Sequence, residues 1–190
     1  MHECSDVILK SIRTPHVEIE FRIGKRNRNM FDSNVGEKMF NDVKRRLERY
    51  KDWENVLKRE DEVYYWNNNV RCIYDEVAGT STCVKKEKQH VQDIPNNPLD
   101  VRMCISTEVP VKQPDDEATR NVVRKRTSFI RKNVSIDLTE VHGNTGDIDD
   151  EHKVMYQIEI EVIDPKKINS IFDVYTIIWK ITNVLNILSK

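Results

Sequence analysis

Residues 16–24 alternate strictly between apolar and charged side chains, and this alternation constrains the fold more than any other feature of the chain. Every second residue from Val17 to Ile23 is apolar, and the residues between them are Glu18, Glu20 and Arg22. A period of two is that of a β-strand, whose successive side chains point to opposite faces. The segment therefore predicts a sheet with one apolar and one charged face, on which two carboxylates lie about 6–7 Å apart along the strand.

The same pattern returns near the other end of the chain. Residues 156–162 carry Glu159 and Glu161 on one face and branched apolar residues on the other. If the two segments pair, four carboxylates share one face, and like charges that close do not all stay ionised without a cation. A divalent metal with oxygen ligands would resolve the conflict. The ordinary alternative is the wet face of a half-buried antiparallel sheet.

Composition limits the classes of protein that remain. The chain has 190 residues and a net charge of −1, which fits one domain and gives no global basic field to capture nucleic acid. The four cysteines form no Cys-x-x-Cys pair, so we expect reduced thiols rather than a zinc site or a disulfide framework. No signal peptide opens the chain, and polar residues such as Asp173 and Lys180 interrupt the apolar C-terminal segment, which predicts no membrane span.

The remaining segments predict an α+β chain of about eight strands, mostly antiparallel because their connections are short. Besides the two segments above, we expect strands at 62–66, 70–75, 82–89, 101–109, 121–130 and 134–141. Helices are expected at 5–13, 33–51, with Ser33 as the N-cap, and 165–188. A Gly/Asn/Asp loop is expected across 142–151.

The charges of the polar faces sort by strand. Carboxylates dominate the first and last strands, whereas basic groups dominate the central ones. The candidates on the central strands are Arg71, Lys85 (if Val84 faces the apolar side), Arg102, Glu108, Arg124, Arg126, Ser128, Asp137 and Thr139. A closed sheet with its polar faces inward would give a lumen with acids on one wall and arginine forks, which suit phosphate oxygens, on another. The alternative is an open sheet whose charged face meets water.

Together these motifs resemble the triphosphate tunnel metalloenzymes, and within them the metal-dependent RNA 5′-triphosphatases of fungi, protozoa and large DNA viruses. The two Glu-x-Glu strands are similar to the metal-binding motifs of that family. Residues 124–129 resemble its basic strand, residues 137–139 its Asp-Leu-Thr strand, and residues 100–111 the strand that ends in Glu-x-Pro. The similarity runs in the family's order from Val17 to Val162. Fungal members carry an arginine where Ser135 stands, which predicts that Arg131 or Arg102 replaces that phosphate contact or that it is missing.

The resemblance implies an eight-stranded antiparallel closed β-barrel with flanking helices, formed by residues 1–190 alone or as the N-terminal part of a longer capping enzyme like those of giant viruses. It implies hydrolysis of the γ-phosphate of triphosphate-ended RNA, with NTP hydrolysis as a side activity. By position, Glu18, Glu20, Glu159 and Glu161 would hold Mg²⁺ or Mn²⁺. Arg71, Lys85, Arg124 and Arg126 would hold the triphosphate, and Glu108 would brace the basic wall or orient water.

The resemblance also implies partners and a location. Guanylyltransferase and methyltransferase domains of one capping apparatus would act on the product, in the cytoplasm, virus factory or virion for a virus and in the nucleus for a cell. Two other functions remain: a small-molecule triphosphatase or cyclase in the same tunnel, and a noncatalytic polyphosphate- or RNA-binding barrel. The chain has no Gly-x-x-x-x-Gly-Lys-Ser/Thr motif, which disfavours a P-loop NTPase.

Overall fold

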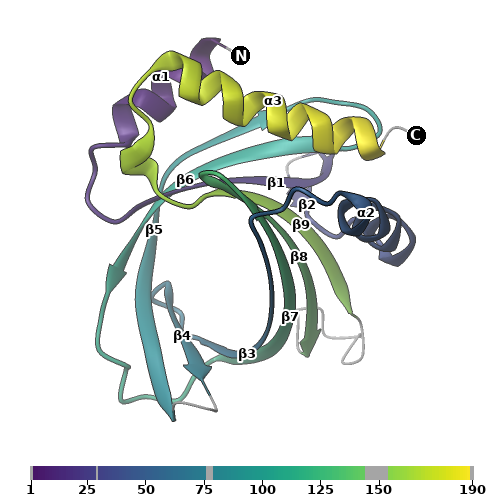
Figure 1. Ribbon diagram of the computed structural model, residues 1–190. Helices are drawn as coiled ribbons and strands as arrows, with labels where there is room; N and C mark the ends of the chain where they lie inside the picture. The colour runs from purple at the N-terminus through teal and green to yellow at the C-terminus, as the bar shows by residue number, and fades with distance from the viewer. Residues whose placement is uncertain (1, 29, 76–78, 144–153, 189–190) are drawn as a thin grey trace.

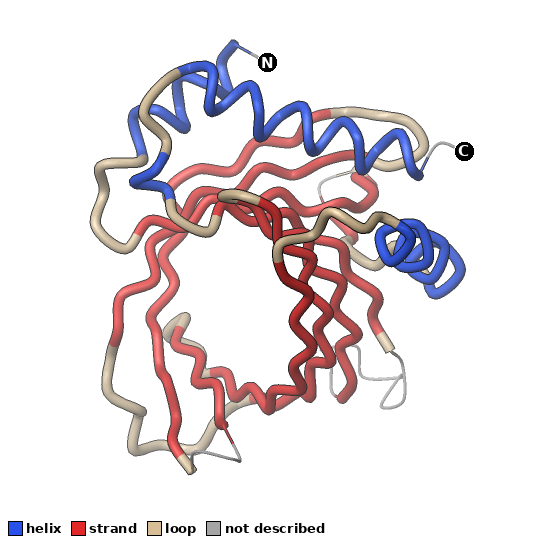
Figure 2. The backbone as a smooth tube through the Cα atoms, in the orientation of Figure 1, coloured by secondary structure: helices blue, strands red, loops and turns tan. Residues whose placement is uncertain are grey.

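The computed structural model describes residues 2–28, 30–75, 79–143 and 154–188, and its strands form a closed antiparallel barrel (Figure 2). The eight barrel strands are β1 (Val17–Asn27), β3 (Asn55–Tyr65), β4 (Val70–Asp75), β5 (Thr80–Ile94), β6 (Asp100–Pro110), β7 (Arg120–Arg131), β8 (Val134–Gly143) and β9 (Met155–Val162). They follow each other in the order β1-β6-β5-β4-β3-β7-β8-β9. The barrel closes where β9 pairs with β1, so the predicted pairing of the two Glu-x-Glu strands is confirmed.

The helices all lie outside the barrel. They are α1 (His2–Ser11), α2 (Glu37–Arg49) and α3 (Ile171–Leu188), the last preceded by the 3₁₀ turn η1 (Pro165–Lys167). Figure 1 shows α1 and α3 lying across the barrel above β1 and β6, and α2 beside β9. The apolar face of β1, with Phe21 1% exposed and Ile23 0% exposed, belongs to the same core cluster as Val174 and Ile177 of α3. Each such side chain contributes roughly 1.5–3 kcal/mol of burial, so the hydrophobic core holds the apolar faces outward and leaves the polar faces to the lumen.

A short strand, β2 (Met30–Asp32), folds back onto the end of β1. The turn depends on Gly24, because a Cβ there would lie 2.2 Å from the Asp32 carbonyl oxygen and 2.6 Å from the Phe31 ring. The glycine therefore lets the aromatic ring lie directly on the backbone of β1.

Several predicted boundaries were wrong for identifiable reasons. β3 begins at Asn55 instead of residue 62, because its first six residues are all exposed and the two apolar ones, Val56 and Leu57, are adjacent, so the segment shows no alternation. β5 extends to Ile94, well past the predicted end at 89, and contains an irregularity between Lys88 and His90 that breaks its period. The N-cap of α2 is Gly36 rather than Ser33.

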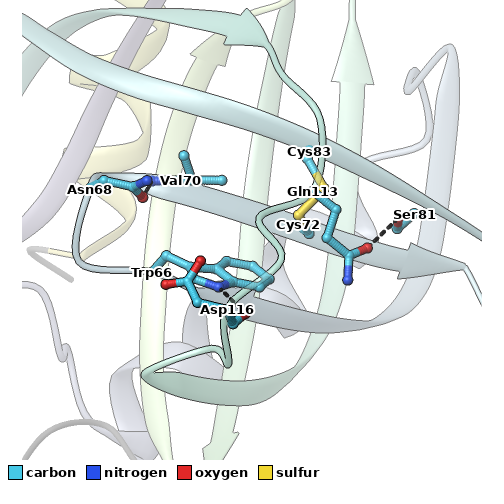
Figure 3. Close-up of a disulfide and its surroundings, with 8 residues drawn as sticks. All are labelled: Trp66, Asn68, Val70, Cys72, Ser81, Cys83, Gln113 and Asp116. Carbon is cyan, nitrogen blue, oxygen red and sulfur yellow. Dashed lines mark hydrogen bonds between the residues drawn. A yellow bond between two sulfur atoms is a disulfide. The ribbon is translucent and has the colours of Figure 1, made fainter.

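The cysteine prediction was also wrong. Cys72 and Cys83 form a disulfide, and only Cys4 and Cys104 are free (Figure 3). The two residues lie directly opposite each other on β4 and β5, with their Cα atoms 4.0 Å apart. The pairing depends on a strand register that cysteine spacing alone does not specify. The bond lies on the outer face of the barrel, in a small apolar cluster with Trp66 and Val70.

Two further predictions meet the structure only in part. The loop predicted across 142–151 falls mostly on residues 144–153, which lie outside the described residues. Among the helices that the structure describes, none is both long and apolar enough to cross a membrane.

Candidate active site

The lumen of the barrel contains a cavity of about 1350 Å³, and charged side chains from most of the strands line it. The closed charged lumen predicted from the sequence is therefore present, and the open sheet is excluded. Glu20, Glu159, Arg124 and Arg126, which the closed form required to face one space, all line this cavity. The site divides into an acidic wall and a basic wall.

The acidic wall consists of Glu18 and Glu20 on β1 and Glu159 and Glu161 on β9. Glu20 lies directly opposite Glu161 in the sheet, and Arg22 lies opposite Glu159. Burial and the nearby Glu159 raise the pKa of Glu20 to about 7. Burial, with Glu18 and Asp137 close by, raises the pKa of Glu161 to about 7 as well. The wall therefore holds more carboxylates than its surroundings can keep ionised.

Two cations of the chain itself lie between these carboxylates. Arg22 bridges the wall, with Nη2 2.8 Å from Glu20 Oε1 and Nε 3.1 Å from Glu159 Oε1. The Lys86 ammonium contacts Glu18 and lies 3.4 Å from Glu20 Oε1. Burial opposes ionisation of Glu18, but Lys86 beside it holds the pKa of that carboxyl below its usual value. Arg22 and Lys86 thus neutralise part of the wall.

The basic wall faces the acidic one and consists of Arg71 on β4 and Arg124 and Arg126 on β7. Arg71 Nη2 donates to Glu108 Oε1 at 2.6 Å, and Glu108 also lies 3.4 Å from Lys86. Glu108 therefore contacts Arg71 and Lys86 at the same time. The contact between Arg124 and Asp61, at 3.6 Å, is looser.

Two arginines of the basic wall have buried donors without a partner. Within the described part of the chain, the Nε atoms of Arg71 and Arg124 are buried and have no acceptor to which they donate a hydrogen bond. Burial, together with the charges of Arg126 and Arg71, lowers the pKa of Arg124. A buried unpaired donor costs free energy that an acceptor from outside would recover. These two side chains are therefore suited to bind an anion.

Arg126 differs from these two arginines, because side chains of β8 and β9 hold its guanidinium in place. Its Nε donates to Thr139 Oγ1 at 3.0 Å, and its two terminal nitrogens lie 3.3 Å from Asp137 Oδ2 and from Glu159 Oε2. Thr139 and Asp137 are almost fully buried, as is Ser128, and none of the three lines the cavity. Thr139 and Asp137, which were predicted as substrate ligands, therefore lie behind Arg126 and fix its orientation. Ser128 lies opposite Asp137 in the sheet and does not line the cavity either.

Lys85 and Arg102 do not reach the cavity. Lys85 pairs with Glu87 at 2.8 Å and does not line the cavity, and Lys86 takes the position in the lumen that was predicted for Lys85. The phase of β5 is set by Cys83, which faces outward to reach Cys72, so the residue at 85 also faces outward. The outward cysteine was the signal that the sequence reading missed.

Neither residue proposed to replace the missing arginine at position 135 lines the cavity. Arg102 donates two hydrogen bonds to Asp93, at 2.6 and 2.9 Å, and stacks on Phe31. Arg131 stacks on Tyr50, outside the barrel. The Ser135 hydroxyl donates to Asp137. Neither Arg102 nor Arg131 therefore adds a guanidinium to the cavity.

The acidic wall fits a hard divalent cation by its donor chemistry, because four carboxylates supply oxygen ligands and two of them have pKa values raised to about 7. In the present arrangement, Arg22 and Lys86 contact the carboxylates, and no three His, Cys, Asp or Glu side chains of the described residues converge on one point. A bound cation would therefore compete with Arg22 and Lys86 for the same oxygens.

Comparison with known protein families identifies the family of the chain. The family model of the mRNA capping enzyme, beta chain, matches residues 10–176, which include every strand of the barrel. The chain belongs to this family. It is the family of the RNA 5′-triphosphatases of mRNA capping, which hydrolyse a phosphoric anhydride at the RNA 5′ end and are in general metal-dependent.

Solved structures agree on the fold. The S. pombe Pct1 RNA triphosphatase superposes with a TM-score of 0.77 at 16% identity, covering 96% of this chain and 91% of that one. The same protein in complex with the Spt5 CTD gives 0.75 at 16% identity, covering 96% and 92%. The Mimivirus capping enzyme triphosphatase gives 0.70 at 16% identity, covering 100% and 96%. No curated protein sequence matches the chain.

Proposed function

We propose that this chain removes the γ-phosphate from triphosphate-ended RNA, leaving a diphosphate end, and that it also converts NTP to NDP. The observation that carries the proposal is the pair of buried arginines with unpaired Nε donors that faces four glutamates across one enclosed cavity. An anion with several negative oxygens complements the arginines. The glutamates would repel that anion unless a cation lay between them, which is the charge pattern of a metal–triphosphate complex.

The arginines would act on the phosphate oxygens. Arg124 and Arg71 offer unpaired donors to the chain of phosphates, and Arg126 stands between them and the acidic wall, already oriented by Thr139 and Asp137. Charge that develops on the transferred phosphoryl group and on the leaving oxygen would be stabilised by groups already in place, at little cost of reorganisation. Water would attack in line with the bridge between the β- and γ-phosphates.

Glu18, Glu20, Glu159 and Glu161 would hold Mg²⁺ or Mn²⁺. When bound, the ion would supply Lewis-acid charge and a template for the γ-phosphate. The chain's own contribution is to place these carboxylates on the adjacent strands β1 and β9, away from Arg71 and Arg124. Glu108 braces Arg71 and Lys86, and either Glu108 or a glutamate of the acidic wall would orient the attacking water.

Two other functions use the same cavity. A small-molecule triphosphatase or cyclase would share the two walls but would be selective for one nucleotide or release pyrophosphate. A noncatalytic polyphosphate- or RNA-binding barrel would have no use for the acidic wall, since four carboxylates in the lumen weaken anion binding. The acidic wall therefore favours catalysis.

The proposal also concerns the setting of the reaction. The diphosphate end would pass to a guanylyltransferase and a methyltransferase, whether these belong to the same polypeptide or to separate chains. We expect this work in the cytoplasm, in a virus factory or virion, if the enzyme is viral, and in the nucleus if it is cellular. The exposed basic segment of Lys25, Arg26 and Arg28 at the end of β1 would guide the RNA chain.

The test is a parallel assay of ATP, GTP and triphosphate RNA with Mg²⁺, with Mn²⁺ and with EDTA, in which the products are resolved by chromatography. We expect orthophosphate from all three substrates, a diphosphate RNA end, weak base preference and no turnover in EDTA. Lys25→Ala or Arg26→Ala should slow the RNA reaction more than the NTP reaction. Release of pyrophosphate, or activity on a single nucleotide, would favour the small-molecule alternative, and metal-independent binding without turnover would favour the noncatalytic barrel.

A further inference from the structure

The cavity continues past the basic wall, and its lining changes there from charged to aromatic and apolar. Tyr65 on β3 and Arg120 at the start of β7 line this end, together with the apolar side chains Ile73, Val122, Val141 and Met155. Tyr65 packs against the buried cluster of Val63, Val122 and Val141, which is separate from the main core. A triphosphate has no use for an apolar surface, so this end of the cavity suits a different part of the substrate.

The sheet register ties this end directly to the phosphate-binding arginines. Tyr65 lies opposite Arg71 on one neighbouring strand and opposite Arg120 on the other. Side chains opposite each other on one face of a sheet are about 5 Å apart at their Cβ atoms. Tyr65 is also close enough to Arg124 to act on the pKa of its guanidinium. The acidic wall, Arg126, Arg124 and Tyr65 therefore follow one another along the cavity.

Tyr65 and Arg120 form a layered planar surface. The Arg120 guanidinium carbon lies 4.4 Å from the centroid of the Tyr65 ring. Aromatic rings and arginine planes are the surfaces on which unpaired nucleic-acid bases stack, because every base presents a π-face. The β3–β4 turn beside them carries Asn67 and Asn69, which also line the cavity, and a backbone hydrogen bond from Lys86 N to Asn69 O at 2.9 Å ties this turn to β5.

We propose that Tyr65 and Arg120 form the binding site for the first nucleoside of the substrate, with its base stacked on their layered surface. This inference rests on the proposed function, since it assumes that the phosphates occupy the basic wall. The site would take any of the four bases, because stacking discriminates weakly among them, and Asn67 and Asn69 would donate or accept hydrogen bonds at the ribose or base edge. The triphosphate would then lie with its α-phosphate toward Arg71 and its γ-phosphate toward the acidic wall.

The experiment compares substrates with and without a nucleoside. Wild type, Tyr65→Leu, Tyr65→Phe and Arg120→Ala are assayed for kcat/KM on ATP, GTP and inorganic tripolyphosphate, and for equilibrium binding of the non-hydrolysable β,γ-imido analogue of ATP. We expect Tyr65→Leu to lower the ratio of NTP to tripolyphosphate kcat/KM about tenfold, with a similar loss of analogue affinity. Arg120→Ala should lower the same ratio, and Tyr65→Phe, which keeps the ring, should leave it near the wild-type value.

The matched control is Tyr74→Leu, the same change at a tyrosine that is 38% exposed and lines a groove on the outer face of the barrel. An equal loss on tripolyphosphate and NTP in Tyr65→Leu would overturn the nucleoside site, because it would assign Tyr65 to triphosphate binding or to barrel packing. An unchanged ratio would overturn it too. Failure of the proposed function gives a different result, namely a wild-type protein that hydrolyses none of the three substrates, and the binding measurement then still tests the stacking site alone.

Discussion

The acidic and basic walls of the lumen solve the problem of buried charge in opposite ways. The acidic wall is partly neutralised from within the chain, because Arg22 bridges Glu20 and Glu159 while Lys86 contacts Glu18. The basic wall is left incomplete, because Arg71 and Arg124 keep buried Nε atoms that no acceptor of the described residues satisfies. The two walls therefore suit different ligands. A cation on the acidic wall would displace Arg22 or Lys86 from the carboxylates, and an anion on the basic wall would accept hydrogen bonds from the Nε atoms of Arg71 and Arg124.

The largest effect should come from removing a carboxylate of the acidic wall. Glu20→Ala and Glu159→Ala should each lower kcat for triphosphate RNA by at least a hundredfold, or about 2.7 kcal/mol of barrier, because the wall would lose an oxygen ligand and leave Arg22 half-paired. The loss of kcat is measured by steady-state phosphate release from triphosphate RNA. Glu60→Ala is the control, since Glu60 is exposed and pairs with Lys125 on the outside. Equal losses in Glu60→Ala and Glu20→Ala would show that the acidic wall has no special role.

A smaller effect is expected on the basic wall. Arg124→Ala should lower kcat/KM for RNA and for NTP together, by about thirtyfold, because it removes one charge-assisted contact that both substrates share. Arg124→Lys should recover only part of the loss, since an ammonium lacks the planar fork. The neighbouring Lys125, which points outward to Glu60, provides the control variant Lys125→Ala. A loss confined to RNA would contradict a shared phosphate site.

The pH dependence of stability should distinguish the two walls without any substrate. In EDTA, Glu161 has a folded-state pKa of about 7 against an ordinary value of 4.5, so the folded state binds more protons than the unfolded state between these pH values. Its contribution to stability is therefore present below pH 4.5 and is lost as the pH rises through 7. Urea unfolding should show Glu161→Gln gaining roughly 2 kcal/mol on wild type at pH 8 and nothing at pH 4.

The same sign applies to Glu20, whose surroundings include Glu159, Arg22, Lys86 and Glu18. Glu20→Gln should therefore flatten the pH profile in the same direction as Glu161→Gln. Arginines of the basic wall do not titrate in this range, so Arg124→Ala should leave the profile parallel to that of wild type. Parallel profiles for all three variants would mean that the acidic wall carries no excess charge in the metal-free protein.

The smallest effect on activity is expected from the disulfide. It lies on the outer face of β4 and β5, behind Arg71, and closes a loop of 11 residues. Cys72→Ser together with Cys83→Ser should lower the free energy of unfolding by about 2–3 kcal/mol through the unfolded chain, while changing kcat/KM less than twofold. Thermal unfolding with and without reductant measures the change in stability, and phosphate release measures the change in kcat/KM. If the double variant lost most of its activity at unchanged stability, the disulfide on the outer face of β4 would be required for the function of the basic wall.

Much of this arrangement could be predicted from the sequence, because alternation specifies which residues share a face. The period of two in β1 and β9 predicts the inward carboxylates, and the same period in β7 predicts the inward Arg124 and Arg126; all of these line the cavity. In β8 it predicts Asp137 and Thr139 on the inner face, but these side chains lie behind Arg126 and do not line the cavity. Closure itself was not decided by the alternation, because an open sheet with its charged face in water has the same pattern; it was implied by the resemblance and is confirmed by the pairing of β9 with β1.

The failures have a common physical cause. Lys86 was mistaken for Lys85 because the phase of β5 depends on the pairing of Cys83 with Cys72 across the sheet, which is a property of register. Tyr65 and Arg120 were missed because one strand position says nothing about the neighbour opposite it. The sequence placed Arg22 only on the charged face of the first strand, and its bridge between Glu20 and Glu159 depends on the closing pair of strands. The chemistry of this site depends on which residues lie opposite each other on neighbouring strands, and the register of the strands determines these pairs.

The most direct test of the two walls is a crystal structure with Mn²⁺ and inorganic tripolyphosphate, with the metal located by anomalous scattering. We predict an anomalous peak on the acidic wall, between the carboxylates of β1 and β9, and phosphate oxygens within hydrogen-bond distance of Arg71 and Arg124 at their now unpaired Nε atoms. Arg22 or Lys86 should move away from at least one carboxylate. Manganese at any other position, or tripolyphosphate bound outside the lumen with both arginines unchanged, would contradict the division of the site into a cation wall and an anion wall.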